Sequence, residues 1–552
     1  MEARTREILR IADKAFVGKD TVNTLHQEIA YNFYPERADF TTQRDPGEEF
    51  NDNFASFPQI VRRDLGNMIS ALTRPEDSPW GSIHVDNEEL DEEDGNRKFL
   101  EGLTKVQRKA MYDPRAGFVR ATKQGDHDYV TFGNVVIYGS PNSTLDAMMF
   151  RNYHLRDCAW MENAEGAVDT LFRKWMPTAH QLKQLFLGSV SDDVMRACEK
   201  EPDKKFECKH VVMPTRLYRY KDMKTEREYP FTSLFVECAS EKILEEKPLN
   251  YFPYVVARWH TIADTVYGRS PVTEIALPDG RTMQVVTRTL REAGEKYVDP
   301  PLLQVQDALR SDVNSYPGGI TTVSAEYDER LGEVLRPLTQ DRHGVPIGFE
   351  IANALKEDLR QAFYLNTLGM PDFGNREVTA FEYAQRLRER IRESSPLLEP
   401  INHEYNNALW ELSFNILMDN GGLPMHLAPE SLKKSGAGIK FKFRTPLQEM
   451  EEQAEAASFA DGLTRILVPA MQIDPAQVAQ MNMTKATRDS LRSVGWKADW
   501  FGPEEAVDEE RQRMREMQEM QQQIALAGQA GAAVEQGGKA GQAVKDAMGE
   551  NQ

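Results

Sequence analysis

Two long amphipathic helices separated by a short, turn-rich insertion are the feature that most restricts how this chain can fold. Apolar residues recur every three or four positions across 277–298 and again across 346–366, which predicts a helix in each range. The stripes are Met283, Val286, Leu290, Ala293 and Tyr297 in the first helix, and Ala352, Leu355, Leu359 and Phe363 in the second. Pro300 and Pro301 end the first helix, because proline lacks an amide hydrogen.

The insertion between these helices predicts a small domain at the tip of a stalk. Runs 302–305, 319–323 and 334–337 are rich in apolar and β-branched residues, and Gly and Pro separate them, which is typical of short strands. Helices with polar sides and one apolar stripe can bury that stripe against neighbouring copies. We therefore expect a closed homo-oligomer with rotational symmetry.

The rest of the chain predicts an α+β protein that is mostly helical. A mixed α/β region comes first, and helices dominate after residue 379. The expected helices are 3–30, 58–72, 449–466 and 503–526, and the expected strands are 129–132, 135–138, 170–175, 216–220 and 229–238. The last two strands are expected to form a hairpin. The final Gly- and Ala-rich segment is either a packed helical barrel or a disordered tail.

Length and composition indicate a folded protein of several domains. The 552 residues exceed what one hydrophobic core organises, which favours three or four domains. A hydrophobic content of 40% and a charged content of 28% are typical of soluble folded chains. No apolar run approaches the ~18 residues of a membrane span, so we expect no membrane insertion.

No motif in the sequence predicts catalysis or cofactor binding. There is no phosphate-binding loop of the GxxxxGK[ST] type, and Ser140 lacks the second glycine of a nucleophile elbow. The four cysteines are far apart, without a CxxC pair. The acidic run 88–94 lacks a first calcium ligand and is expected to be a solvated loop, and 126–128 (Asp-His-Asp) is expected to be a polar turn. We expect no enzyme, metal or cofactor, with a metal-dependent nuclease or other DNA-processing enzyme using scattered carboxylates as the alternative.

A capping box marks the start of another long helix. Thr379 can accept a hydrogen bond from the backbone three residues on, while Glu382 reaches back to the start of the helix. Arg386 and Arg390 lie one turn apart beside its apolar stripe. The stripe is Ala380, Ala384, Leu387, Ile391 and Leu398. Two prolines further on, at 396 and 400, are expected to kink or break the helix.

Short motifs in a fixed order extend across most of residues 20–430. They are Tyr251-Phe252-Pro253, Ala257-Arg258-Trp259, Tyr267-Gly268-Arg269-Ser270-Pro271, Ala276-Leu277-Pro278-Asp279, Asp299-Pro300-Pro301, Pro317-Gly318-Gly319, Thr379-Ala380-Phe381-Glu382 with Arg386, Glu404, and Gly421-Gly422-Leu423-Pro424. Each motif alone is weak, whereas the ordered series is fairly specific. The series resembles the head-to-tail connector (portal) proteins of short-tailed bacteriophages.

This resemblance implies an architecture and a function. Portal subunits form a ring, usually of twelve copies, at one capsid vertex, through which double-stranded DNA is packaged and ejected. Mapped onto this chain, the parts are an α/β wing (1–276), a stem (277–298 and 346–366) with a clip at its tip (299–345), a tunnel loop (367–378), a tunnel helix with a return to the wing (379–448) and a helical crown (449–552). The implied partners are the terminase large subunit, tail or adaptor proteins, and capsid and scaffolding proteins. The implied location is the virion, after assembly in the host cytoplasm.

The resemblance also places candidate DNA-facing residues in the tunnel loop and helix. These are Asn375, Arg376, Arg386 and Arg390, with Thr379 and Glu382 capping the helix. The formal net charge of the chain is −20, which argues against a tight DNA-binding surface. It suits a pore through which DNA slides without sticking, although an acidic soluble enzyme would have the same total charge.

Overall fold

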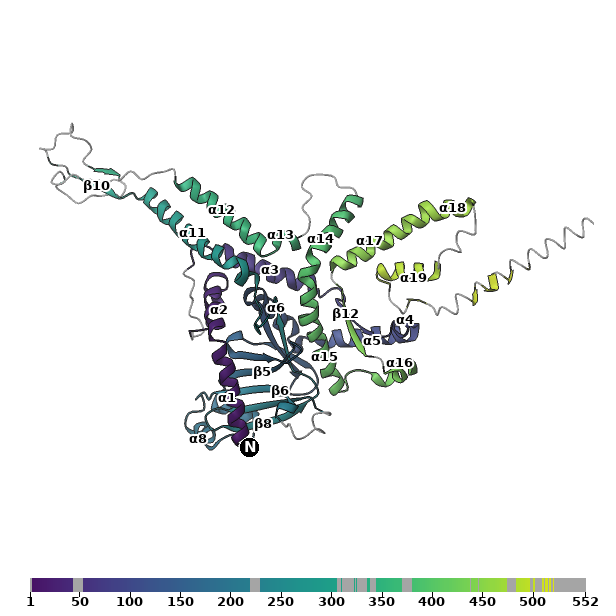
Figure 1. Cartoon of the computed structure of the whole chain (residues 1–552), viewed down its shortest axis with the longest axis horizontal. Coiled ribbons are helices and arrows are strands. Elements are labelled where there is room, and N and C mark those ends of the chain that lie inside the picture. Colours follow the sequence, from purple (N-terminus) through teal and green to yellow (C-terminus); the bar gives the residue numbers. More distant parts are fainter. Residues whose placement is uncertain are drawn as a thin grey trace, which may run out of the picture. The chain divides into compact units, whose positions relative to one another are not determined.

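The computed structural model describes residues 2–42, 53–218, 229–304, 335–337, 344–369, 380–436, 438–444, 446–473, 483–496 and 500–501, and isolated positions between 309 and 520 (Figure 1). The chain separates into two compact units. The first comprises Met1–His84, Gly102–His426 and Ile439–Glu451, and the second comprises Val85–Glu101, Leu427–Gly438 and Glu452–Gln552. None of the described helices is long and apolar enough to cross a membrane.

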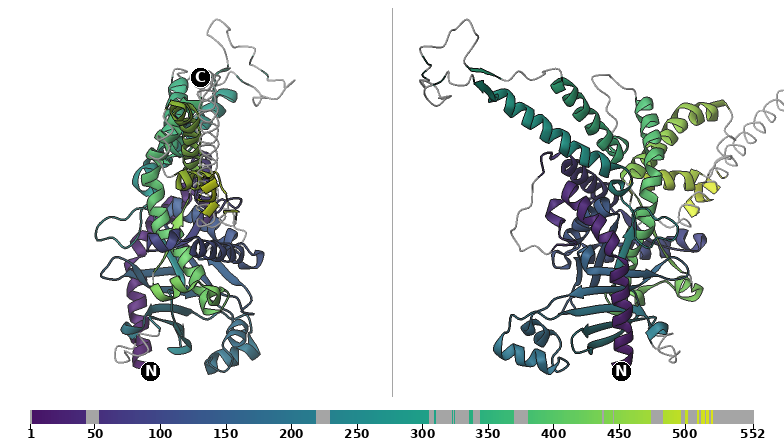
Figure 2. Two further views of the ribbon diagram at one scale, coloured as in Figure 1. Left: turned by 90° about the vertical axis from the view of Figure 1, so that its right-hand side faces the viewer. Right: turned by 60° about the vertical axis from the view of Figure 1, so that its left-hand side comes forward.

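Two antiparallel sheets lie at the centre of the first unit (Figure 2). The larger has the order β4 (Cys158–Glu162), β5 (Val168–Trp175), β6 (Cys208–Pro214), β7 (Phe231–Glu237) and β8 (Lys242–Leu249), and the smaller has the order β3 (Met148–Asn152), β2 (Asn134–Pro141) and β9 (Tyr254–Arg258). Strand β6 is buried along its whole length, because alternate residues enter two different cores. Val211 packs in a cluster with helix α1 (Glu2–Gly18), and Cys208 packs in a cluster with α7 (Ala179–Leu185) and α8 (Asp192–Lys200).

The predicted helix at 3–30 is two helices, α1 and α2 (Asp20–Phe33), joined at Lys19. The ammonium of Lys19 is fully buried and donates hydrogen bonds to the carbonyls of Leu155 and Cys158, each at 2.6 Å. It also lies 4.9 Å from the ring centre of Trp160. Burial lowers the pKa of Lys19 to about 8. This one side chain therefore ties the junction of α1 and α2 to the start of β4.

Helix α3 (Phe57–Thr73) confirms the predicted helix at 58–72, but three other predictions in the first unit are wrong. Residues 129–132 form the last turn of α6 (Phe118–Phe132), not a strand, and 126–128 also lie in this helix rather than in a turn. Helix α6 is buried on most of its sides, so its apolar residues show no clear helical period. Residues 215–218 form the short helix α9 (Thr215–Tyr218), and β7 pairs with β6 instead.

The stalk begins with a π-helical turn, Val272–Ala276, which continues into α11 (Leu277–Val298). Strands β10 (Leu302–Gln304) and β11 (Leu335–Pro337) pair antiparallel beyond it, and α12 (Gly344–Ala362) returns alongside α11 (Figure 1). The remaining predicted tip strand, 319–323, lies outside the described residues. The stripe of α12 is buried within the subunit, since Ala352, Leu355 and Leu359 are each at most 9% exposed. In the stripe of α11, Met283 is 1% exposed whereas Tyr297 is 39% exposed. For α11, packing of the stripe against neighbouring copies therefore stays a prediction.

After the short helix α13 (Leu365–Leu368), one uninterrupted helix continues the chain within the first unit. It consists of α14 (Ala380–Pro400), a π-helical segment (Ile401–Asn406) and α15 (Asn407–Asp419), and at 1.5 Å per residue it is about 60 Å long. Pro396 lies inside α14 without ending it. The prolines therefore do not break the helix, which instead passes through a π-helical turn directly after Pro400.

The other described elements complete the fold as mostly helical α+β, which confirms the predicted class. In the first unit they are the 3₁₀ turns Pro35–Arg37, Pro114–Ala116, Leu155–Asp157 and Met425–Leu427, and a two-stranded sheet of β1 (Gly81–Val85) with β12 (Ile439–Phe443). The helices that contribute to the second unit are α4 (Glu88–Glu92), α5 (Asp94–Met111, whose first half belongs here), α16 (Glu430–Ser435), α17 (Pro446–Gly462), α18 (Val468–Ile473) and α19 (Met483–Ser493), with a π-helical turn at Leu463–Leu467.

Within the second unit, Arg488 of α19 holds α5 by an ion pair to Asp94, with 3.3 Å between Nη1 and Oδ2. The acidic run 88–94, expected to be a loop, is mostly helical. Asn87 caps α4 by accepting a hydrogen bond from the backbone N–H of Glu89. The predicted helix at 449–466 is present as α17 and the turn that follows it.

We predict that the protein loses stability below neutral pH through His26. This side chain is 2% exposed between Phe40 and Phe132, and burial lowers its pKa to about 3, below the value of about 6.5 in an unfolded chain. The unfolded state therefore binds the proton more tightly, and the contribution of His26 to stability falls as pH drops from about 6.5 towards 3. At pH 5 the loss is about 2 kcal/mol.

Urea unfolding of the His26→Leu variant at pH 7 and pH 5 measures this contribution. The variant should lose about 2 kcal/mol less than the wild type between the two pH values. The exposed His180 provides the control, since His180→Leu should leave the pH dependence unchanged. An equal change in both variants would contradict the assignment to His26.

Candidate functional site

The described part of the candidate tunnel segment is helix α14. Asn375, Arg376 and Thr379 lie outside the described residues. Glu382 and Arg390 lie on α14, and Arg386 is half-buried on the same helix. Arg386 and Arg390 are four residues apart, so they share one side of the helix. The capping box and the path of the loop before α14 remain predictions.

The π-helical segment Ile401–Asn406 is the point where this helix enters the core of the first unit. The N–H of Asn407 donates to the carbonyl of Asn402, five residues earlier, which widens the turn. Pro400, which cannot donate a helical hydrogen bond, directly precedes this wider turn. Ile401, Tyr405 and Asn406 are fully buried, so the segment is held firmly on its inner side.

A buried arginine binds the inner side of this segment. Arg74, directly after α3, donates to Oδ1 of Asn406 at 2.6 Å and forms an ion pair with Asp126 of α6. Its guanidinium also lies 4.5 Å from the ring centre of Tyr405. The side chains of Arg74 and Asp126 are 2% and 0% exposed. One cation therefore joins α3, α6 and the π-helical segment.

A second arginine binds the same segment from the sheet. Arg258, at the end of β9, donates from Nη2 to Oε1 of Glu404 at 2.8 Å, and its backbone N–H donates to Oε2 of Glu404 at 2.9 Å. It also forms an ion pair with Glu162 of β4 and donates to the carbonyl of Gly166 at 3.2 Å. A guanidinium that satisfies several acceptors at once fixes their relative positions. Arg258 and Glu404 both belong to the motif series.

The base of the stalk is fixed by close backbone contacts that require glycine. Asn134 of β2 exchanges two hydrogen bonds with Gly268, through its side-chain oxygen at 2.8 Å and its side-chain nitrogen at 3.0 Å. Gly133 has φ of +72°, and a Cβ there would lie 2.4 Å from the carbonyl carbon of Arg269. Ser270 donates to the carbonyl of Thr131 at 2.7 Å. The motif at 267–271 therefore attaches the start of the stalk to α6 and β2.

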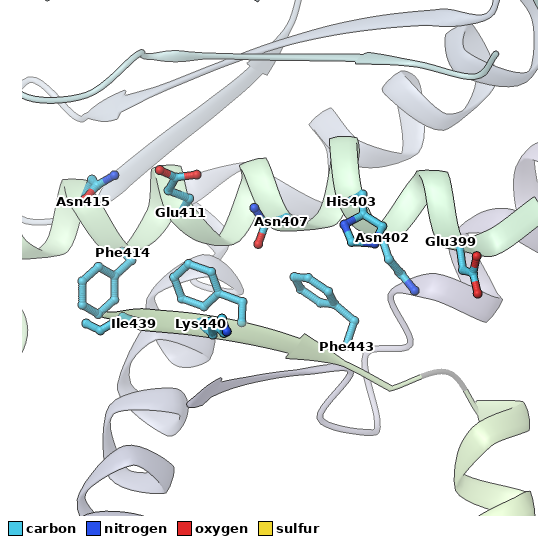
Figure 3. A pocket seen from close by; sticks show the side chains of 11 residues that line it. Glu399, Asn402, His403, Asn407, Glu411, Phe414, Asn415, Ile439, Lys440 and Phe443 are labelled. Atoms are coloured by element: carbon cyan, nitrogen blue, oxygen red, sulfur yellow. The ribbon is translucent and has the colours of Figure 1, made fainter. Parts of the chain in front are cut away.

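A pocket of about 580 Å³ lies beside the long helix, between it and β12 (Figure 3). Glu399, His403 and Glu411 line it from the helix, and Lys440 and Phe443 line it from β12. Its wall is thus acidic and polar on one side and partly aromatic on the other. Among the residues that the structure describes, no three His, Cys, Asp or Glu side chains are placed to hold a metal ion.

Sequence reasoning missed the buried ion pairs around the long helix. Asp126 was assigned to a turn, although it is fully buried against Arg74, which lies 52 residues away along the chain. The pairing of Arg258 with Glu404 crosses 146 residues. A single sequence gives no signal for such distant pairs. The membership of Arg258 and Glu404 in one ordered motif series was the only available hint.

We predict that Arg74 is required for the fold of this region. Arg74→Met would leave the carboxylate of Asp126 buried without its cation, which costs about 3–5 kcal/mol of unfolding free energy. The double variant Arg74→Met/Asp126→Leu should recover most of that loss, because no unpaired charge remains. Arg63→Met, on the exposed side of α3, is the control and should change stability by less than about 0.5 kcal/mol. Denaturant titration of the variants measures these differences, and a double variant as unstable as the single one would refute this account.

Comparison with known proteins identifies the family. The family model described as "Bacteriophage head to tail connecting protein" matches residues 5–501. A probable portal protein of Bordetella phage BPP-1 is 22% identical over 517 residues, which are 91% of this chain and 90% of the relative. The portal protein of Salmonella phage epsilon15 is 23% identical over 382 residues, which are 68% and 66% of the two chains.

Solved structures show a weaker likeness. A chain from the virion of a native gene transfer agent particle is 11% identical and has a TM-score of 0.35, over 74% of this chain and 86% of that chain. A chain from the neck of the native particle is 12% identical with the same TM-score and coverage. The family model, in contrast, spans most of the sequence, and on that match this chain belongs to the bacteriophage head-to-tail connecting proteins.

Proposed function

We propose that this protein, which has the portal function of its family, forms a ring at one capsid vertex through which double-stranded DNA is packaged and later ejected. The observation that carries this proposal is the family match across residues 5–501. The helical stalk built from α11 and α12, with a strand pair beyond it, supports the proposal as a projecting part of such a ring subunit. Twelve copies are proposed from the family resemblance. Neither the family match nor the two curated relatives support the nuclease alternative.

The parts of the chain are proposed to have the roles that the resemblance implies. The sheets and surrounding helices up to residue 276 are the wing, α11 and α12 are the stem, and 299–345 is the clip. The clip is proposed to bind the terminase large subunit during packaging and tail or adaptor proteins afterwards, since a turn-rich insertion at the end of a stalk is well exposed. Capsid and scaffolding proteins are proposed partners of the outer surface. As a virion component, the ring would be assembled in the host cytoplasm.

The tunnel loop and α14 are proposed to line the narrowest part of the channel. A helix held firmly at 401–406 can support the segment before it, and Arg386 and Arg390 would then contact phosphate groups. An overall charge of −20 would keep the rest of the wall from retaining DNA.

Electron microscopy of the purified protein tests the ring directly. We expect closed rings with rotational symmetry at micromolar concentration, and no cleavage of duplex DNA when magnesium or manganese is added. A uniformly monomeric sample would refute the ring, and specific DNA cleavage would revive the nuclease alternative.

A second prediction concerns the arginines of α14. Arg386→Ala/Arg390→Ala should leave ring assembly intact but reduce DNA retention or packaging yield, because each phosphate contact contributes a salt-dependent attraction. Lys433→Ala/Lys434→Ala, a change of equal charge on α16, provides the control. Packaging and retention equal to the wild type across a range of salt concentrations would remove the two arginines from the channel.

A further inference from the structure

Helix α12 carries more apolar surface than its own subunit covers. The side chains of its inner stripe, including Leu355 and Leu359, are at most 9% exposed. Ile347, Phe349 and Ile351 nevertheless leave 56%, 57% and 45% of their areas exposed. Single exposed apolar residues are normal, but three within five residues of one helix leave apolar area that a partner could cover.

The exposed apolar residues project from two opposite flanks of α12. Residues two apart in an α-helix are rotated by about 200°, so Phe349 points away from both Ile347 and Ile351. Residues four apart share a side, which places Ile347 and Ile351 together. The buried stripe lies between the two flanks, facing α11, where Gly348 allows close approach of Leu290. A patch on one side would fit a single contact, whereas apolar groups on both sides fit a neighbour on each side.

Charges continue the same two flanks about two to three turns further along the helix. Asp358 lies seven residues after Ile351 and therefore on the isoleucine flank. Lys356 lies seven residues after Phe349, and Arg360 one turn beyond it, so both lie on the phenylalanine flank. We call these the acidic flank (Ile347, Ile351 and Asp358) and the basic flank (Phe349, Lys356 and Arg360). The apolar residues of the two flanks lie at the same height along the helix, and so do their charged residues.

The acidic flank also has an excess of negative charge at its base. Burial raises the pKa of Asp279 in α11, and the nearby charge of Asp358 raises it further. On the other flank, the guanidinium of Arg360 lies 5.5 Å from the ring centre of Phe57 in α3 and 3.4 Å from Glu357, and half of the side chain remains exposed. The described structure of one subunit thus leaves carboxylates unbalanced on one side and cations partly exposed on the other.

We infer that the two flanks of α12 are the two halves of a head-to-tail contact, in which the acidic flank of one copy packs against the basic flank of the next. Rotation about a ring axis preserves height along that axis. The isoleucines of one copy therefore meet Phe349 of its neighbour, while Asp358 meets Lys356 and Arg360. Two different surfaces that complement each other close a ring, whereas a two-fold dimer pairs one surface with itself. This inference rests on the proposed ring and names the surfaces that build it.

Two oppositely charged variants test the contact. In Asp358→Lys both flanks are positive, and in Lys356→Glu/Arg360→Glu both are negative. Each variant alone would bring like charges together and should raise the concentration needed for ring formation about tenfold or more. Mixed in equal amounts, the two should restore rings near the wild-type concentration, because every contact then joins opposite charges. Glu350→Lys, on the outward side of the same helix, is the matched control and should assemble like the wild type.

Native mass spectrometry, with circular dichroism to confirm that each variant is folded, distinguishes the outcomes. Rings from the mixture but from neither variant alone would support the inference. Folded variants that each form rings alone, or a mixture that fails where the wild type succeeds, would overturn it and leave the ring itself intact. A wild type that forms no rings would instead overturn the proposed function.

Cysteine cross-linking gives an independent result. With a bis-maleimide reagent, the double variant Phe349→Cys/Ile351→Cys should give a ladder of covalent oligomers. Neither single variant should do so, because each flank meets the other flank and not itself. The wild type controls for the native cysteines, of which Cys158 and Cys208 are buried. Cross-linked dimers from a single variant would indicate a face-to-face contact and overturn the inference.

Discussion

Two buried arginines that bind the same π-helical segment connect the elements of the first unit. Arg74 and Arg258 approach the π-helical segment at 401–406 from different elements, and their partners include Asp126, Asn406 and Glu404. Burying such charges is favourable only when nearly all their hydrogen bonds are satisfied. Because the hydrogen-bonding partners lie on α3, α6, β4 and β9, a shift of one of these elements would break bonds to the others.

A proline lies next to each π-helical turn of the described helices. Pro271 directly precedes the turn at 272–276, and Pro400 directly precedes the turn at 401–406. In the second unit, Pro469 follows closely after the turn at 463–467. A proline removes one helical hydrogen bond and clashes with the turn before it. The wider turns at 272–276 and 463–467 closely precede Pro278 and Pro469 and can relieve this clash, whereas the turn at 401–406 follows Pro400.

Secondary structure was largely predictable from the sequence where one side of an element is exposed. The stripes of α3, α11 and α12 show a clear period because water covers the opposite side, and their positions were anticipated closely. Helix α6 was misread in part, since its buried sides hide the period. Of the candidate tunnel residues, the sequence placed Arg386 and Arg390 on a helix, which the structure shows. The pairing of Arg74 with Asp126 could not be anticipated, because it depends on how α3 and α6 pack.

The stalk and the long helix share one anchor, and this limits how the subunit can move. Strand β9 ends at Arg258, which binds Glu404 of the π-helical segment, and the next residue, Trp259, donates its N–H to Gly133. Gly133 and Asn134 in turn hold Gly268 and the start of the stalk. Displacing α15 relative to the base of α11 would therefore break several buried hydrogen bonds at once. The stalk base and α15 should therefore move as one piece.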